Sequence, residues 1–164
     1  GALYAAARDL GCNKISLGHH YDDVIETILM SILYSGQTKT MLPKLPAKNF
    51  PGMELIRPLY LIEEADIERF WKSMGVSFIR CACSLTEKRE DADYETVTRR
   101  AEVKRLIREG SKTNPYLKAN LFRSVVEVNT ETLLSYRDQN GLHQNWEYEL
   151  PSSFDQQGDR QDSE

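Results

Sequence analysis

The most constraining feature of this chain is a dense group of polar, titratable side chains that follows a short apolar run. Residues 18–27 are Gly-His-His-Tyr-Asp-Asp-Val-Ile-Glu-Thr, directly after Ile15-Ser16-Leu17. The apolar run predicts a short buried strand, and the apolar spacing after it predicts an amphipathic helix. In open α/β sheets, ligands bind beyond the carboxyl ends of the strands. Titratable groups beside apolar residues are costly without a partner, so this junction is the first candidate site.

The order of predicted elements favours an α/β fold. We expect strands at 14–17, near Leu45, at 54–59 and at 76–79, and helices at 3–10, 22–35, 62–74, 93–109, 115–128 and 130–137. Alternation of strands and helices followed by helices alone predicts a partial parallel sheet with a C-terminal helical extension. The predicted parts are an α/β domain at 1–90, a basic helical extension at 91–138, and a disordered tail at 139–164.

The charge is unevenly distributed along the chain. The net charge is −4 over 164 residues, yet residues 98–123 hold eight basic side chains against two acidic ones. A basic segment in an acidic chain indicates an anionic partner on one face. No apolar run is long enough to span a membrane, and no secretory signal is present. Three cysteines do not form a secreted disulfide framework, so a reducing cytoplasm is expected.

Two interpretations of the junction stay open on spacing alone. Asp23 followed by Glu26 fits a capping box, which would stabilise the helix start by about 1 kcal/mol. Capping gives no role to His19, His20 or Asp22. Backbone N–H groups at a helix start can bind phosphate, and a nearby carboxylate can hold a magnesium ion that bridges phosphate oxygens. A nucleotide site therefore accounts for more of these residues.

A pair of cysteines forms the second constellation. Cys81 and Cys83 follow the predicted strand at 76–79. Three interpretations are open: the thiols act as small buried hydrophobes, as a redox pair or as metal ligands. Two thiols cannot hold a zinc ion or an iron–sulfur cluster alone, so further ligands would come from elsewhere. Cys12 lies beside a predicted helix end, and we expect it to fill the core.

Several basic side chains are candidates for binding anions. Arg57 ends a predicted strand and either contacts a phosphate or is an ordinary surface charge. Arg100, Lys104 and Arg108 recur every four residues and share one helix face. Because few acids lie nearby in sequence to pair with them, nucleic-acid contact is an alternative to a solvated surface.

The residues of the junction resemble a known family. Residues 18–27 match the GHHxDDxxxT pattern of the PP-loop ATP pyrophosphatases that modify tRNA, and the further motifs resemble the tRNA 2-thiocytidine synthetases, which are cytidine 2-sulfurtransferases. The resemblance covers residues 1–137. The fold it implies is of the adenine nucleotide alpha hydrolase-like (HUP) type. The other segments that carry it are Ser35-Gly36, residues 41–45, residues 56–59 and residues 66–70.

The resemblance implies a two-step reaction. The cytidine carbonyl oxygen attacks the α-phosphate of ATP, and sulfide on a three-cysteine [4Fe–4S] cluster then displaces AMP. Asp22 and then Asp23 would be the magnesium-binding or active-site carboxylates. Gly18 and His19 would line the nucleotide, and His20 would orient or neutralise phosphate. Arg57 joins these as a nucleotide-binding candidate.

Of the three cluster ligands that the resemblance implies, this chain supplies one. Either Cys83, which we favour, or Cys81 would be the third iron ligand. Family members also carry a CxxC pair and a Ser-Gly-Gly-x-Asp-Ser phosphate loop, and the resemblance places both upstream of residue 1. We therefore expect a C-terminal portion that is inactive alone.

The expected partners follow from the same resemblance. They are ATP, magnesium, tRNA and a sulfur donor such as a cysteine desulfurase, with a homodimer left as an option. The alternatives are an adenylating tRNA modifier of the lysidine synthetase kind and a non-catalytic RNA-binding module.

Overall fold

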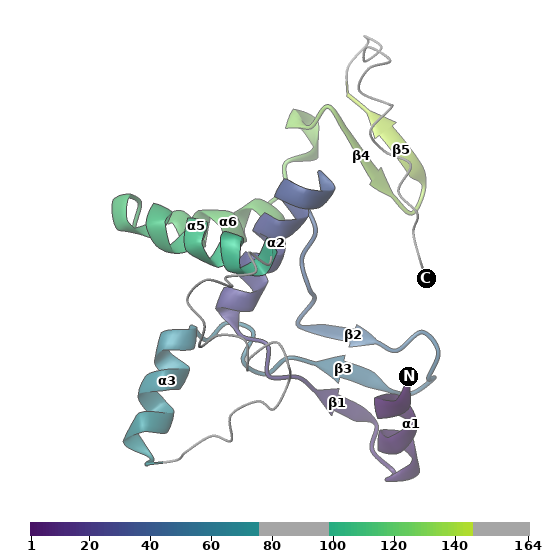
Figure 1. Ribbon diagram of the computed structural model, residues 1–164. Helices are drawn as coiled ribbons and strands as arrows, with labels where there is room; N and C mark the ends of the chain where they lie inside the picture. The colour runs from purple at the N-terminus through teal and green to yellow at the C-terminus, as the bar shows by residue number, and fades with distance from the viewer. Residues whose placement is uncertain (76–98, 146–164) are drawn as a thin grey trace. The chain divides into compact units, whose positions relative to one another are not determined.

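The structure, a computed structural model, describes residues 1–75 and 99–145 (Figure 1). The chain divides into two compact units, Gly1–Val126 and Glu127–Glu164. The first contains a three-stranded sheet with helices, and the second contains a two-stranded sheet. The α/β class predicted from the sequence is confirmed. Cys81, Cys83 and the predicted strand at 76–79 lie outside the described residues.

The sheet of the first unit is mixed rather than wholly parallel. Its strands are β1 (Lys14–Ser16), β2 (Lys44–Pro46) and β3 (Glu54–Ile56), in the order β1-β3-β2. β1 and β3 are parallel, whereas β2 and β3 are antiparallel. The short connection between β2 and β3 turns at Gly52, whose φ of 81° favours glycine. A loop this short can join antiparallel strands but not parallel ones, which explains the difference from the prediction.

The helices of the first unit lie close to their predicted positions. Among residues 1–75 and 99–145, no helix is long and apolar enough to cross a membrane. Gly36, with a φ of 55°, ends the helix that follows β1. The helices are α1 (Ala2–Asp9), α2 (Tyr21–Ser35), α3 (Glu64–Ser73), α5 (Arg99–Thr113) and α6 (Leu117–Val126).

The apolar core of the first unit lies among helices. α5 and α6 lie side by side against α2 (Figure 1). Val24, Ile25 and Ile28 of α2 and Val103 and Ile107 of α5 are buried together. Burying each such side chain contributes about 1.5–3 kcal/mol. This packing fixes the first turn of α2, where the polar residues of the junction lie, against helices from the C-terminal half of the chain.

The second unit contains a β-hairpin that the sequence analysis missed. A short 3₁₀ turn (Thr130–Thr132) precedes β4 (Ser135–Asp138) and β5 (Gly141–Gln144). The predicted helix at 130–137 is therefore wrong, and so is the predicted disorder within residues 139–145.

Turn chemistry between the two strands explains the error. The backbone N–H of Asn140 donates to Asp138 Oδ1 at 2.7 Å, and Gly141 adopts a φ of 122°. The rings of Tyr136 and His143 stack across the strands with centroids 4.6 Å apart. Asp, Asn and Gly at these positions favour a tight turn over a helix.

Candidate functional site

The carboxyl ends of β1 and β3 meet the first turn of α2. The backbone N–H of Leu17 donates to the Ile56 carbonyl at 3.0 Å, which extends the parallel pairing just beyond both strands. The N–H of Tyr21 donates to the Ile62 carbonyl at 2.9 Å and ties the start of α2 to the segment before α3. Residues Gly18 to His20 therefore lie at the strand ends, as predicted.

Unpartnered polar atoms gather at these strand ends. Within residues 1–75 and 99–145, five buried side-chain polar atoms have no hydrogen-bond partner, and three of them are His19 Nδ1, His20 Nδ1 and Arg57 Nε. Another Arg57 nitrogen donates to the Leu42 carbonyl. Apart from its two chain neighbours, no residue has an atom within 4 Å of a Cβ built on Gly18. Buried polar groups are normally paired, so open space beside unsatisfied nitrogens suits a polar ligand.

Asp22 makes two bonds to other helices. Its Oδ2 accepts from the backbone N–H of Glu64 at 2.8 Å, at the start of α3. Its Oδ1 accepts from Lys118 Nζ at 2.6 Å, and the same ammonium lies 3.2 Å from Glu63 Oε2. The Asp22 side chain is 14% exposed. Burial alone would raise the pKa of its carboxyl, but the Glu64 N–H and Lys118 outweigh burial and lower it.

Asp23 stabilises the start of α2, one turn earlier than predicted. Its carboxylate accepts from the backbone N–H of His20 at 3.0 Å, so the capping arrangement joins His20 and Asp23. The capping alternative therefore holds for Asp23, but its partner is His20 rather than Glu26. The helix begins at Tyr21, and this start places Glu26 on the buried side of α2.

Glu26 is a buried carboxylate held by α5. Arg100 Nε lies 2.9 Å from Glu26 Oε2, and another Arg100 nitrogen lies 3.5 Å from Asp23 Oδ1. Burial raises the pKa of Glu26, and the positive charges of Arg100 and Lys104 offset that rise only in part. The positive charge of Arg100 therefore offsets part of the cost of burying an ionised Glu26 between α2 and α5.

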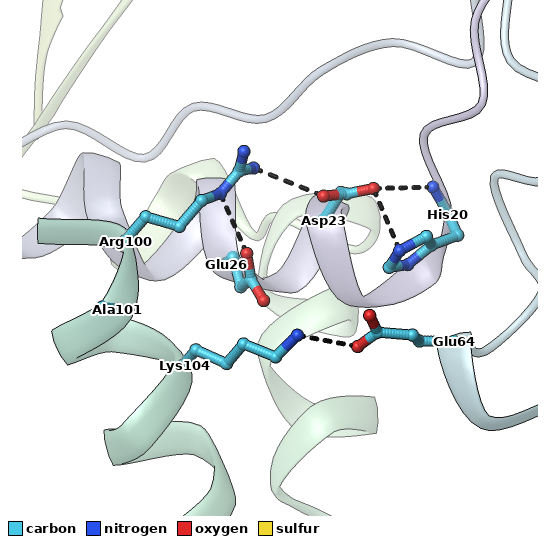
Figure 2. Close-up of a pocket in the computed structure, with 7 residues that line it drawn as sticks. All are labelled: His20, Asp23, Glu26, Glu64, Arg100, Ala101 and Lys104. Atoms are coloured by element: carbon cyan, nitrogen blue, oxygen red, sulfur yellow. Dashed lines mark hydrogen bonds and ion pairs between the residues drawn. The ribbon is translucent and has the colours of Figure 1, made fainter. Parts of the chain in front are cut away.

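A polar cavity of about 210 Å³ lies where α2, α3 and α5 approach one another. Figure 2 shows Arg100 directed at Asp23 and Glu26, and Lys104 directed at Glu64, 2.8 Å from its Oε2. The cavity is lined by His20, Asp23, Glu26, Glu64, Arg100, Ala101 and Lys104.

The basic row on α5, formed by Arg100, Lys104 and Arg108, has more acidic partners than the nearby sequence indicated. Arg100 and Lys104 bind acids of α2 and α3 that lie far away in the sequence. Arg108 is 69% exposed and lies 3.4 Å from Glu109, its neighbour in the chain. The premise that few acids could pair with this row is therefore wrong for its first two members. Cys12, expected in the core, is exposed with a free thiol, because it follows the turn that ends α1.

Lys118, Glu63 and Glu64 belong to this site although the sequence analysis did not select them. Lys118 is one of eight cations in the basic segment, and its partner Asp22 lies 96 residues away. No local spacing pattern distinguishes such a residue from an ordinary surface charge.

Comparison with known proteins decides the family. The family model described as the PP-loop domain matches residues 1–88, more than half of the chain. The chain belongs to the PP-loop domain family. Its strand-to-helix junction, with Gly18 to Asp23, lies inside the matched PP-loop segment.

Curated relatives extend the PP-loop similarity beyond residue 88. The chain is 37% identical over 134 residues to a tRNA-cytidine(32) 2-sulfurtransferase of Syntrophotalea carbinolica, which covers 82% of this chain and 49% of the relative. It is 36% identical to the protein of the same name from Coxiella burnetii, over 83% of this chain and 50% of that relative. The chain spans about half the length of these relatives.

A solved structure shares the fold of this chain. The U34-tRNA thiolase NcsA from Methanococcus maripaludis, with its [4Fe-4S] cluster, matches with a TM-score of 0.55 and 18% sequence identity. The match covers 78% of this chain and 41% of that one. This agreement confirms the HUP-like α/β fold expected from the sequence.

The lowered pKa of Asp22 predicts how stability depends on pH. We expect Asp22→Asn to lower the free energy of unfolding of the intact protein by roughly 1–3 kcal/mol at neutral pH. The Asp22 charge stabilises the fold above its unfolded-state pKa of about 3.9, and this contribution is lost as the pH falls through the lower folded-state value.

Urea denaturation across a pH series measures the effect. The difference between wild type and Asp22→Asn should stay constant down to about pH 5 and shrink below about pH 4. A difference that grows on acidification would contradict the assignment.

Proposed function

We propose that the intact protein is an ATP-dependent tRNA cytidine 2-sulfurtransferase. The observation that carries this proposal is the similarity, over 134 residues, to proteins named tRNA-cytidine(32) 2-sulfurtransferase. The open polar junction at the ends of β1 and β3 supports it, because a PP-loop domain needs a nucleotide site there. The NcsA structure, a tRNA thiolase, adds support at the level of the fold.

The residues present at the junction fit a magnesium-bound nucleotide. Gly18 leaves open space for it, and the unpartnered His19 and Arg57 nitrogens are suited to polar contacts with it. Asp22 supplies a carboxylate for magnesium. The structure shows no cluster of three metal-binding side chains within residues 1–75 and 99–145. This is compatible with magnesium, which usually takes one or two carboxylates together with substrate phosphates and water.

The proposed chemistry divides into two steps. In the first, the cytidine carbonyl oxygen attacks the α-phosphorus of ATP, the bond to the β-phosphate breaks, and pyrophosphate leaves. Here His20 would orient the phosphates, while Asp23 fixes the start of α2 on which Asp22 is placed. In the second step, sulfide attacks the activated carbon of the base, the bond from that carbon to the adenylated oxygen breaks, and AMP leaves with the oxygen. A [4Fe–4S] cluster held by thiolates, with Cys83 or Cys81 among them, would supply the sulfur-transfer chemistry.

Removing the Asp22 charge tests the first step. We predict that Asp22→Asn lowers pyrophosphate release and tRNA thiolation by the intact protein at least about 100-fold, because magnesium loses its carboxylate while Asn still accepts from the Glu64 N–H. Asp66→Asn on α3 is the matched control, since Asp66 pairs only with Arg69 among the residues described. Normal thiolation by Asp22→Asn would refute the assignment.

Cysteine substitution tests the iron–sulfur proposal. We predict that Cys83→Ser or Cys81→Ser removes the visible absorbance of the cluster from the intact protein, because the third thiolate is lost. Cys12→Ser is the control and should leave the spectrum unchanged, since its exposed thiol lies outside the site. Wild-type protein isolated without iron would instead favour an adenylating modifier that joins an amine to the base.

The tRNA contact we propose is the basic row of α5, formed by Arg100, Lys104 and Arg108. Arg108 is exposed and can bind a phosphate directly. Arg100 and Lys104 would have to exchange their carboxylate partners for phosphates. The partner set then comprises tRNA and a sulfur donor such as a cysteine desulfurase, in the cytoplasm.

Salt dependence distinguishes these contributions. We predict that Arg108→Gln weakens tRNA binding and reduces the slope of log affinity against log salt by roughly one, without loss of stability. Arg100→Gln should also lower the free energy of unfolding, because it leaves Glu26 charged and buried. Filter binding at several salt concentrations measures the first effect, and urea denaturation measures the second. An unchanged slope for the triple substitution at 100, 104 and 108 would mean that this face does not meet RNA.

A further inference from the structure

A lysine from α6, the last helix of the first unit, contacts Asp22 at the strand-to-helix junction. Lys118 lies at the start of α6, and its ammonium is 2.6 Å from Asp22 Oδ1 and 3.2 Å from Glu63 Oε2. The Lys118 side chain is 31% exposed, so part of it remains accessible to a ligand. It therefore brings a positive charge to the carboxylate that the proposed function assigns to magnesium.

The packing of α6 holds the backbone of Lys118 in place. Leu121, Phe122 and Val125 pack against the buried residues of α2 and α5. Phe122 also contacts the Tyr21 ring, with centroids 5.3 Å apart, at the residue that precedes Asp22. Because the backbone of Lys118 is fixed one turn before these contacts, only its flexible four-carbon side chain can change position.

An ammonium and a divalent cation cannot share Asp22 without strong repulsion. Lys118 and a divalent cation at Asp22 would be like charges in a partly buried site, where their repulsion is poorly screened. Either the ammonium moves away, or an anion such as phosphate lies between the two cations and offsets the repulsion. Phosphate oxygens offer such a bridge, since magnesium and lysine both bind them. Phosphates held by magnesium at Asp22 would therefore lie close to the ammonium that is 2.6 Å from Asp22 Oδ1 in this structure.

We propose that Lys118 is a phosphate-binding residue of the nucleotide site. Without nucleotide it neutralises Asp22 and Glu63, and when magnesium takes Asp22 it transfers its hydrogen bonds to the nucleotide's phosphates. This inference rests on the proposed function. It gives α6 a direct part in binding ATP, although α6 follows residue 88, where the PP-loop match ends.

Nucleotide titrations of the intact protein test this role. Lys118→Met keeps the length of the side chain and removes its charge, and Lys118→Arg keeps the charge. Lys112→Met is the matched control, because Lys112 lies on α5 and pairs with exposed Glu109. Calorimetry in magnesium buffer would measure the affinity of each variant for ATP and for adenosine.

The expected pattern separates phosphate binding from general damage. Lys118→Met should bind ATP roughly ten- to a hundredfold more weakly, the effect of one charge-assisted hydrogen bond, and adenosine as tightly as wild type does. Lys118→Arg should recover most of the ATP affinity, and Lys112→Met should match wild type. Circular dichroism and urea denaturation confirm that the variants are folded.

Different outcomes overturn different statements. If wild type binds magnesium–ATP and Lys118→Met binds it equally well, Lys118 is only a structural partner of Asp22 and the inference is wrong. An equal loss of ATP and adenosine affinity would also overturn it, because the site itself would be distorted. If wild type binds no magnesium–ATP at all, the proposed function fails first.

Discussion

The Asp22 carboxylate connects the three helices that surround the junction. From the first turn of α2 it accepts a hydrogen bond from the start of α3 and another from Lys118 on α6. Burial raises the pKa of this carboxyl, and the Glu64 N–H and Lys118 outweigh burial and lower the pKa, so both partners favour the charged form. The position of this one carboxylate therefore depends on segments separated by 42 and 96 residues.

The helical layer has two roles that share the same contacts. Its apolar side buries Val103 and Ile107 against α2, which fixes α5. Its charged side places Arg100 on Asp23 and Glu26, and Lys104 on Glu64. If α5 binds RNA phosphates as proposed, those phosphates compete for cations that also hold the acids beside the proposed nucleotide site. Binding of tRNA and geometry of the site would then be coupled through ion pairs rather than through a moving domain.

Local patterns in the sequence predicted the elements that depend on local physics. The Ile15 strand, the α2 helix with its Gly36 end, and the Gly18 to Asp23 junction all follow from short-range spacing. What spacing could not provide were the long-range partners. Lys118 looked like one surface cation among many, and the acids that pair with Arg100 and Lys104 come from other elements. The hairpin at 135–144 was missed because its turn is set by Asp138 and Gly141, which lie just beyond the end of the predicted helix at 130–137.

The central claim is that the carboxylate at this strand-to-helix junction serves a magnesium-bound nucleotide in addition to stabilising helices. The most direct measurement is a calorimetric titration of the wild-type intact protein with ATP, once with magnesium and once with a chelator. The account predicts saturable ATP binding that requires magnesium. Absence of binding, or binding of the same affinity in the chelator, would contradict it.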